Sequence, residues 1–243
     1  MPKQKIYKYT FLVLLNSFCL ALHAQDDVQM PEETAIQIIE QAEEKAPILA
    51  GGGVSVDFVG LFMKLTNSKY ANMEVAGRLN FKEKFFPLCE VGLGQCDKEG
   101  GDNDNTFSTS SPYFRVGMDY NINKKLNGNR FFCGLRYAFS SFQYDVCNPD
   151  FNDPVWKVSS PLILNGQDGK MQWLEIVVGV ETKLWSIVRL GWNIRYKSRL
   201  HQSNIEMGEP WYVPGFGKNG SSGWGGTVNL LFDVGKTAKK QKK

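Results

Sequence analysis

The chain has 243 residues, with 28 basic and 25 acidic side chains and a formal net charge of +3. Three of the basic residues, Lys3, Lys5 and Lys8, lie at the amino terminus, and without them basic and acidic residues are equal in number. This balance gives no indication of a nucleic-acid partner. The length is ample for one domain with its own core.

The first 24 residues predict an export signal. The amino-terminal lysines precede an apolar run from Tyr9 to Leu22, and the small residue Ala24 follows. This is the layout of a secretory signal peptide with cleavage between Ala24 and Gln25. The run is shorter than the roughly 20 residues that a helix needs to cross a bilayer. No later stretch is a continuous apolar run of that length, so the sequence predicts no transmembrane helix.

Charge separates the remaining chain into three parts. Residues 25–50 are rich in Asp and Glu and predict an acidic periplasmic leader. Residues 236–243 carry five lysines and predict a basic periplasmic tail. The stretch between them, residues 51–235, is the predicted folded domain.

Eight segments of this domain alternate between apolar and polar residues. In residues 72–81, for example, Val75 and Leu79 share one face, and Glu74 and Arg78 share the other. Alternation with period two predicts β-strands, and about ten residues is the length of a tilted membrane strand. The eight predicted strands are residues 53–63, 72–81, 85–95, 112–121, 130–142, 171–184, 188–199 and 224–234.

The connections between these strands alternate in length. They are short at residues 82–84, 122–129 and 185–187, whereas three of the four connections on the other side are much longer. Short periplasmic turns, long outer loops and aromatic residues near both rims are typical of bacterial outer-membrane barrels. We therefore predict an all-β fold, an eight-stranded antiparallel up-and-down transmembrane β-barrel in the cell outer membrane.

The polar faces of the strands collect charged residues of both signs. An eight-stranded barrel is only wide enough to hold its own side chains, so we expect a salt-bridged plug in the lumen. The alternative is a narrow pore that conducts ions or protons. The predicted lumen charges are Asp57, Glu74, Arg78, Glu90, Arg115, Asp119, Arg136, Glu175, Glu181, Lys183, Arg189, Arg195 and Asp233.

One pair of residues offers a candidate catalytic site. His201 precedes Ser203 by two positions, with Glu206 and Glu209 nearby, and this arrangement resembles the one that the lipid A deacylase family uses for acyl transfer. Against it, alternation places both side chains on the lumen side, whereas a lipid acyl chain approaches from outside. We therefore expect no catalytic residues and treat His201 as a loop histidine.

The cysteines show no close metal-ligand spacing, so we expect neither a metal nor a cofactor. Cys89 and Cys133 lie on strands that another strand separates, which predicts free lipid-facing thiols. Cys96 and Cys147 both lie where strands enter the outer loops, and the sequence leaves open whether they form a disulfide. Residues 209–217 hold aromatics between turn formers, which predicts either a loop that caps the barrel or a surface that binds a partner.

Four stretches resemble a known family. They are GLRYAFSSF at residues 134–142, QWLEIVVGV at residues 172–180, YVPGF at residues 212–216 and GWG at residues 223–225. They resemble an uncharacterised family of Bacteroidota outer-membrane β-barrel proteins, a domain of unknown function, similar in architecture to the outer-membrane protein A and X barrels. The resemblance implies fold and location and supplies no catalytic or ligand-binding residues.

The function that we expect is non-enzymatic: a structural or partner-binding component of the cell envelope. Its partners would be outer-membrane lipid and an envelope protein bound through the outer loops or the acidic leader. The alternatives are a lipid-modifying acyl hydrolase that uses His201 and Ser203, or a narrow pore.

Overall fold

The computed structural model describes residues 48–66, 68–99, 106–123, 129–149, 160–203 and 209–235. The predicted signal peptide, nearly all of the acidic leader and the basic tail lie outside these residues and remain predictions. Within the described ranges, no helix has both the length and the hydropathy needed to cross a membrane.

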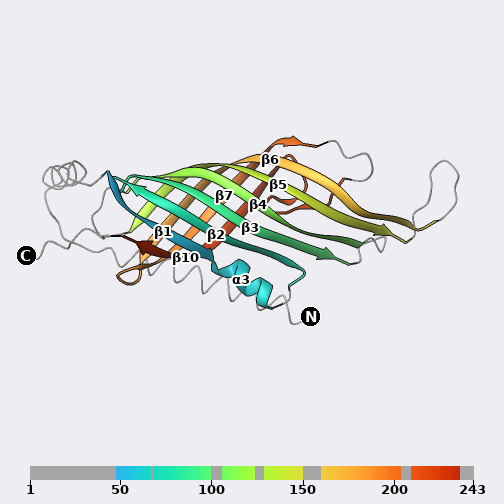
Figure 1. The fold of residues 1–243 in the computed structure, drawn as a ribbon, viewed down its shortest axis with the longest axis horizontal. Helices are drawn as coiled ribbons and strands as arrows, with labels where there is room; N and C mark the ends of the chain where they lie inside the picture. Colours follow the sequence, from blue (N-terminus) through green and yellow to red (C-terminus); the bar gives the residue numbers. More distant parts are fainter. Residues whose placement is uncertain are drawn as a thin grey trace, which may run out of the picture. The chain divides into compact units, whose positions relative to one another are not determined.

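Eight antiparallel strands close into a barrel (Figure 1). Their bounds are β1 (Leu49–Asp57), β2 (Tyr70–Phe81), β3 (Phe85–Lys98), β4 (Thr106–Asn121), β5 (Arg130–Asn148), β6 (Leu162–Lys183), β7 (Val188–Gln202) and β10 (Ser222–Val234). Each strand pairs with the next along the chain, and β10 closes the ring against β1. The predicted eight-stranded antiparallel barrel is confirmed.

The alternation of the sequence places apolar side chains outside and charged ones inside. In β3, Val91 and Leu93 are exposed on the outer surface, whereas Glu90 between its apolar neighbours is buried. Successive side chains of a strand point to opposite faces, so a regular strand maintains this division along its length. The barrel is therefore inverted relative to a water-soluble protein, with its large exposed side chains mostly apolar.

The two ends of the barrel differ as the sequence predicts. Residues 82–84 connect strands β2 and β3, and Lys82 and Glu83 adopt positive φ angles of 52° and 56°. Turns with two left-handed residues match the twist of a hairpin. At the opposite end, β5 and β6 extend to 19 and 22 residues, so both strands continue into the predicted long loop at residues 143–170.

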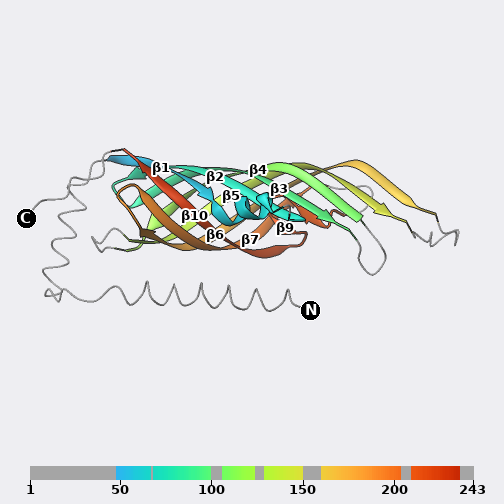
Figure 2. The ribbon, with the colours of Figure 1, turned by 90° about the horizontal axis from the view of Figure 1, so that it is seen from below.

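The first predicted strand, residues 53–63, is wrong in its second half. Strand β1 ends at Asp57, and an α-helix, α3 (Phe58–Leu65), follows. The Asp57 side chain accepts a hydrogen bond from the Val59 N–H at 3.1 Å and so caps the helix. Residues 58–63 are apolar at nearly every position, and period-two alternation cannot distinguish a strand from a helix there. Helix α3 contacts β2 and β10 (Figure 2).

A small hairpin from the β7–β10 connection packs inside the barrel at its long-loop end. We call it the plug hairpin, and its strands are β8 (Tyr212–Val213) and β9 (Gly217–Lys218). Val213 and Phe216 are buried in an aromatic cluster, which we call the plug cluster. Its buried members are Cys96, Phe107, Tyr113, Ala138, Phe142, Tyr144, Met171, Trp173, Tyr212, Val213 and Phe216.

Candidate functional site

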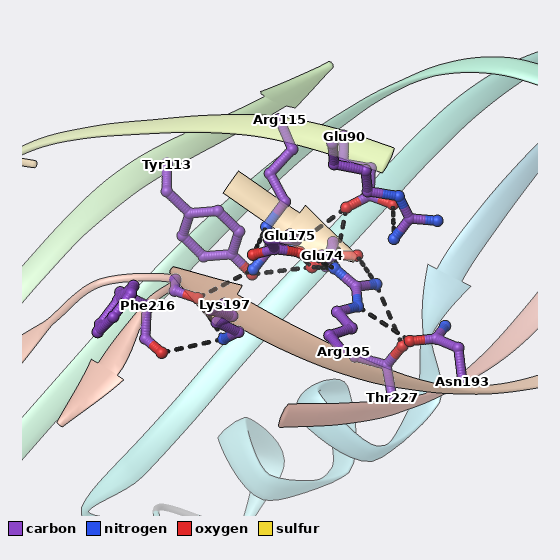
Figure 3. Close-up of polar contacts among 12 residues, drawn as sticks. Glu74, Glu90, Tyr113, Arg115, Glu175, Asn193, Arg195, Lys197, Phe216 and Thr227 are labelled. Atoms are coloured by element: carbon purple, nitrogen blue, oxygen red, sulfur yellow. Dashed lines mark hydrogen bonds and ion pairs between the residues drawn. The ribbon is translucent and has the colours of Figure 1, made fainter. Parts of the chain in front are cut away.

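Below the plug cluster, five strands direct charged side chains toward one point in the lumen (Figure 3). Three carboxylates come from β2, β3 and β6, and two guanidinium groups come from β4 and β7. We call this group the central ion cluster: Glu74, Glu90, Glu175, Arg115 and Arg195. Each of these residues is at most 5% exposed.

Each arginine of the central ion cluster contacts all three carboxylates. Arg195 places Nη2 2.8 Å from Glu74 Oε1 and Nη1 3.0 Å from Glu90 Oε2, and Nη1 lies 3.5 Å from Glu175 Oε2. Arg115 pairs with Glu74, lies 3.2 Å from Glu90 Oε2 and places Nε 2.9 Å from Glu175 Oε1. Burial of charges is tolerated only with such pairing, because an unpaired ion in the interior costs several kcal/mol.

Neutral side chains add hydrogen bonds to the cluster. The Tyr113 hydroxyl donates to Glu74 Oε2 at 3.2 Å, and Trp173 Nε1 donates to Glu175 Oε1 at 2.7 Å. The Tyr113 ring packs against two glycines, where an added Cβ would come within 2.2 Å of the ring at Gly92 and 2.5 Å at Gly215. These glycines are therefore required for the aromatic ring to lie across the lumen.

A second set of ion pairs extends from the central cluster toward the short-turn end. Arg136 links the two sets, with Nη1 2.8 Å from Glu90 Oε1 and Nη2 3.1 Å from Asp119 Oδ2. Further pairs join Arg78 to Glu181, Arg130 to Glu181 at 3.4 Å, and Arg189 to Asp233 at 2.6 Å. The predicted salt-bridged lumen is thus present along the barrel.

Polar contacts hold the plug hairpin on the central ion cluster. Lys197 Nζ donates to the carbonyl oxygens of Gly215 at 2.7 Å and Phe216 at 3.0 Å, and Arg115 Nη2 donates to Gly215 at 3.0 Å. The Tyr212 hydroxyl donates to Asn72 Oδ1 at 2.9 Å. Burial raises the pKa of Tyr212 to about 12, so this hydroxyl stays protonated and able to donate. Of the two predictions for residues 209–217, the capping loop is confirmed.

A cavity of about 30 Å³ lies between Glu90, Arg136 and Glu181 and is also lined by apolar residues of the wall. This is room for one or two water molecules. The ion pairs and the plug hairpin together are suited to closing the lumen.

His201 and Ser203, the alternative catalytic pair, have separate surroundings in the structure. His201 is exposed, and a β-bulge between Gln172 and Trp173 of the paired strand interrupts the alternation beside it. The Ser203 hydroxyl accepts a hydrogen bond from the Lys170 N–H at 3.0 Å. No hydrogen bond joins His201 to Ser203, and Glu206 lies outside the described residues.

The four cysteines of the described chain are free thiols, including Cys96 and Cys147. Cys89 is exposed and Cys133 partly exposed, as predicted for outward positions. Within the described ranges, no group of three His, Cys, Asp or Glu side chains is placed to hold a metal ion.

The predicted lumen set left out several interior residues, among them Arg130, Lys197, Tyr113 and Trp173. Lys197 lies two positions after Arg195, so strand alternation was sufficient to find it. Tyr113 and Trp173 also have inward parity, but aromatic residues near a strand end are equally expected to form an interfacial girdle. Only the position of the plug hairpin shows why they point inward.

Fold and interior together define a closed β-barrel with an apolar outer surface and an ion-paired lumen. The chain belongs to the family described as a domain of unknown function, DUF6048, which matches residues 6–233. This agrees with the predicted membership of an uncharacterised family, while the Bacteroidota origin remains a prediction. No curated protein matches the chain.

One solved structure with a similar fold is Ail, the attachment invasion locus protein of Yersinia pestis, crystallised with the heparin analogue sucrose octasulfate. The likeness covers 75% of this chain and 93% of Ail, with 8% sequence identity and a TM-score of 0.35. At this TM-score, the likeness carries no inference about location or ligands.

Proposed function

We propose that the protein is an integral outer-membrane barrel that acts without catalysis, as a closed anchor for envelope interactions. The observation that supports this proposal is the apolar belt on the outer surface. Its members come from successive strands and are at least 40% exposed, which is unfavourable in water and favourable in lipid. They include Val75, Leu79, Val91, Leu93, Val116, Leu135, Ile176, Val178 and Ile194.

Aromatic pairs at both limits of the belt support membrane placement. Tyr196 and Trp224 contact each other near the long-loop end, with ring centroids 5.1 Å apart. Phe85 and Tyr120 do so at the short-turn end, at 5.4 Å. Tyr and Trp concentrate where hydrocarbon meets the polar headgroups, so these pairs are placed to mark the two interfaces.

The ion-paired lumen favours the proposal of a closed anchor over the alternative of a pore. The central ion cluster and the plug hairpin occupy the interior, and no hydrogen bond joins His201 to Ser203. Function is then expected at the ends of the barrel. The plug hairpin is a poor candidate for partner binding, because Tyr212, Val213 and Phe216 are buried.

The membrane proposal predicts recovery of the protein in the outer-membrane fraction. We expect the unheated protein to migrate differently from the heated protein on gels, because closed barrels resist unfolding by detergent. In planar bilayers, we expect no stepwise conductance. Recovery in the soluble periplasmic fraction would contradict the membrane placement, and stable ion conductance would contradict the closed lumen.

Partner binding is predicted to involve the acidic leader. Deleting residues 26–48 removes its negative charge and should leave the barrel closed, because the β1–β10 pairing begins at Gly52. We expect the truncated protein to keep its heat-dependent mobility and to lose a periplasmic or membrane partner in affinity purification. If it retains every partner of the full-length protein, recognition lies in the outer loops instead.

A further inference from the structure

The strand ladder of the barrel wall is interrupted on its long-loop side. Strand β1 pairs with β10 as far as Asp57 and with β2 as far as Val56. Beyond these positions, residues 222–228 of β10 still pair with β7, and residues 70–74 of β2 still pair with β3. Within the described chain, no strand bridges these two segments. We call this interval the seam.

Helix α3 lies in the seam. It continues directly from β1 and contacts both flanking strands, β2 and β10 (Figure 2). Gly60 is the only buried residue of the helix, and a Cβ there would come within 1.7 Å of the Asn72 carbonyl oxygen. The helix therefore packs its one glycine directly on the β2 backbone.

The outward surface of α3 is apolar. Six of its eight residues are large apolar side chains that are at least 37% exposed, and the values reach 60% at Phe62 and 75% at Leu65. Its one charged residue, Lys64, lies at the last turn and contacts the Gln95 side chain. This surface continues the apolar belt, because Val75 beside the seam is itself half exposed.

Strand pairing shows where the helix lies between the two ends of the barrel. The helix begins after Asp57, which lies opposite Asn229, and the aromatic pair Tyr196–Trp224 lies five positions further outward on β10. An eight-residue helix is about 12 Å long, close to the ~15 Å thickness of one leaflet of a 30 Å hydrocarbon core. The helix is therefore level with the outer leaflet.

We propose that α3 is a lipid-facing segment of the barrel wall that seals the seam and binds the acyl chains of the outer leaflet. A helix is suited to this position because it satisfies its own backbone hydrogen bonds where the ladder is interrupted. Asp57 caps its amino terminus, and the Thr66 hydroxyl donates to the Phe62 carbonyl at 3.1 Å at its other end. The inference rests on the proposed membrane placement.

The test compares the surroundings of single spin labels in phosphatidylcholine vesicles. The starting protein is the chain without the predicted signal peptide, which removes Cys19, and it carries alanine at Cys89, Cys96, Cys133 and Cys147. Phe62→Cys or Leu65→Cys places the label on α3. Val116→Cys reports on the lipid-facing belt, and Lys218→Cys reports on an exposed position of the plug hairpin. Heat-dependent mobility on gels checks that each variant forms a closed barrel.

We expect the label at position 62 to behave like that at position 116, with fast relaxation by oxygen and slow relaxation by a water-soluble nickel chelate. The ratio of the two should be several-fold higher than at position 218. If position 116 is lipid-exposed and both α3 positions are chelate-exposed, the seam inference is wrong and the membrane placement stands. Chelate exposure at position 116 would overturn both.

Discussion

Replacing Arg195 with alanine is expected to lower the free energy of unfolding by about 3 to 5 kcal/mol, the usual cost of breaking a buried ion pair from one side. Arg195 contacts three buried carboxylates, and Arg115 is the one other cation that touches all three. Its removal leaves excess negative charge in the buried cluster. Urea titration, followed by the fraction of protein with folded mobility, measures the loss.

Lys218→Ala is the control for this prediction, because Lys218 is an exposed residue of the plug hairpin. This substitution should change the free energy of unfolding by no more than about 0.5 kcal/mol. The double variant Arg195→Met with Glu74→Gln should lose less than the sum of its single changes, since the paired charges disappear together. Equal stability of Arg195→Ala and Lys218→Ala would show that the lumen is open and hydrated.

Replacing Phe216 with alanine is expected to cost about 3 to 5 kcal/mol, the range for a large buried aromatic side chain. Phe216 is 3% exposed and packs edge-on against Trp173, with ring centroids 5.6 Å apart. The substitution removes this ring contact of the plug hairpin and leaves a cavity in its place. We expect the hairpin to detach and trypsin to cleave at Lys218 faster than in the parent protein.

Phe114→Ala is the matched control, because Phe114 is a strand aromatic of the outer surface that is 48% exposed. It should leave the trypsin pattern unchanged. Loss of the hairpin alone is not expected to produce conductance, because the central ion cluster still fills the lumen below it. If Phe216→Ala keeps parental stability and trypsin resistance, the plug is held by Lys197 and Arg115 without help from its apolar contacts.

Local pattern was sufficient for most of the barrel. Residues 72–81 alternate without interruption, and the structure places them in β2 with Glu74 inward and Val75 outward. The same reasoning failed at residues 58–63, where nearly every position is apolar. It also shortened β6, because the polar stretch NGQDGK at residues 165–170 resembles a loop. Residues 167–170 nevertheless pair with β5, next to a register shift between Tyr144 and Val146.

The interior was predictable in composition and only partly in arrangement. Glu74 and Arg195 are 121 residues apart, and their contact depends on the stagger of strands on opposite sides of the ring. The length of each arginine side chain then decides which carboxylates it reaches. No sequence spacing encodes that geometry, so individual ion pairs were not predictable.

The sequence by itself determined the closed antiparallel barrel, its inverted distribution of polar and apolar residues and the unequal lengths of its connections. These features follow from period-two alternation and turn spacing, which depend on residues close together in the chain. Tertiary structure alone decided the ion pairs, the insertion of residues 212–216 and the helix in the seam. Each of these depends on which surfaces remain unfilled once the ring has closed, because the lumen and the seam exist only in the closed barrel.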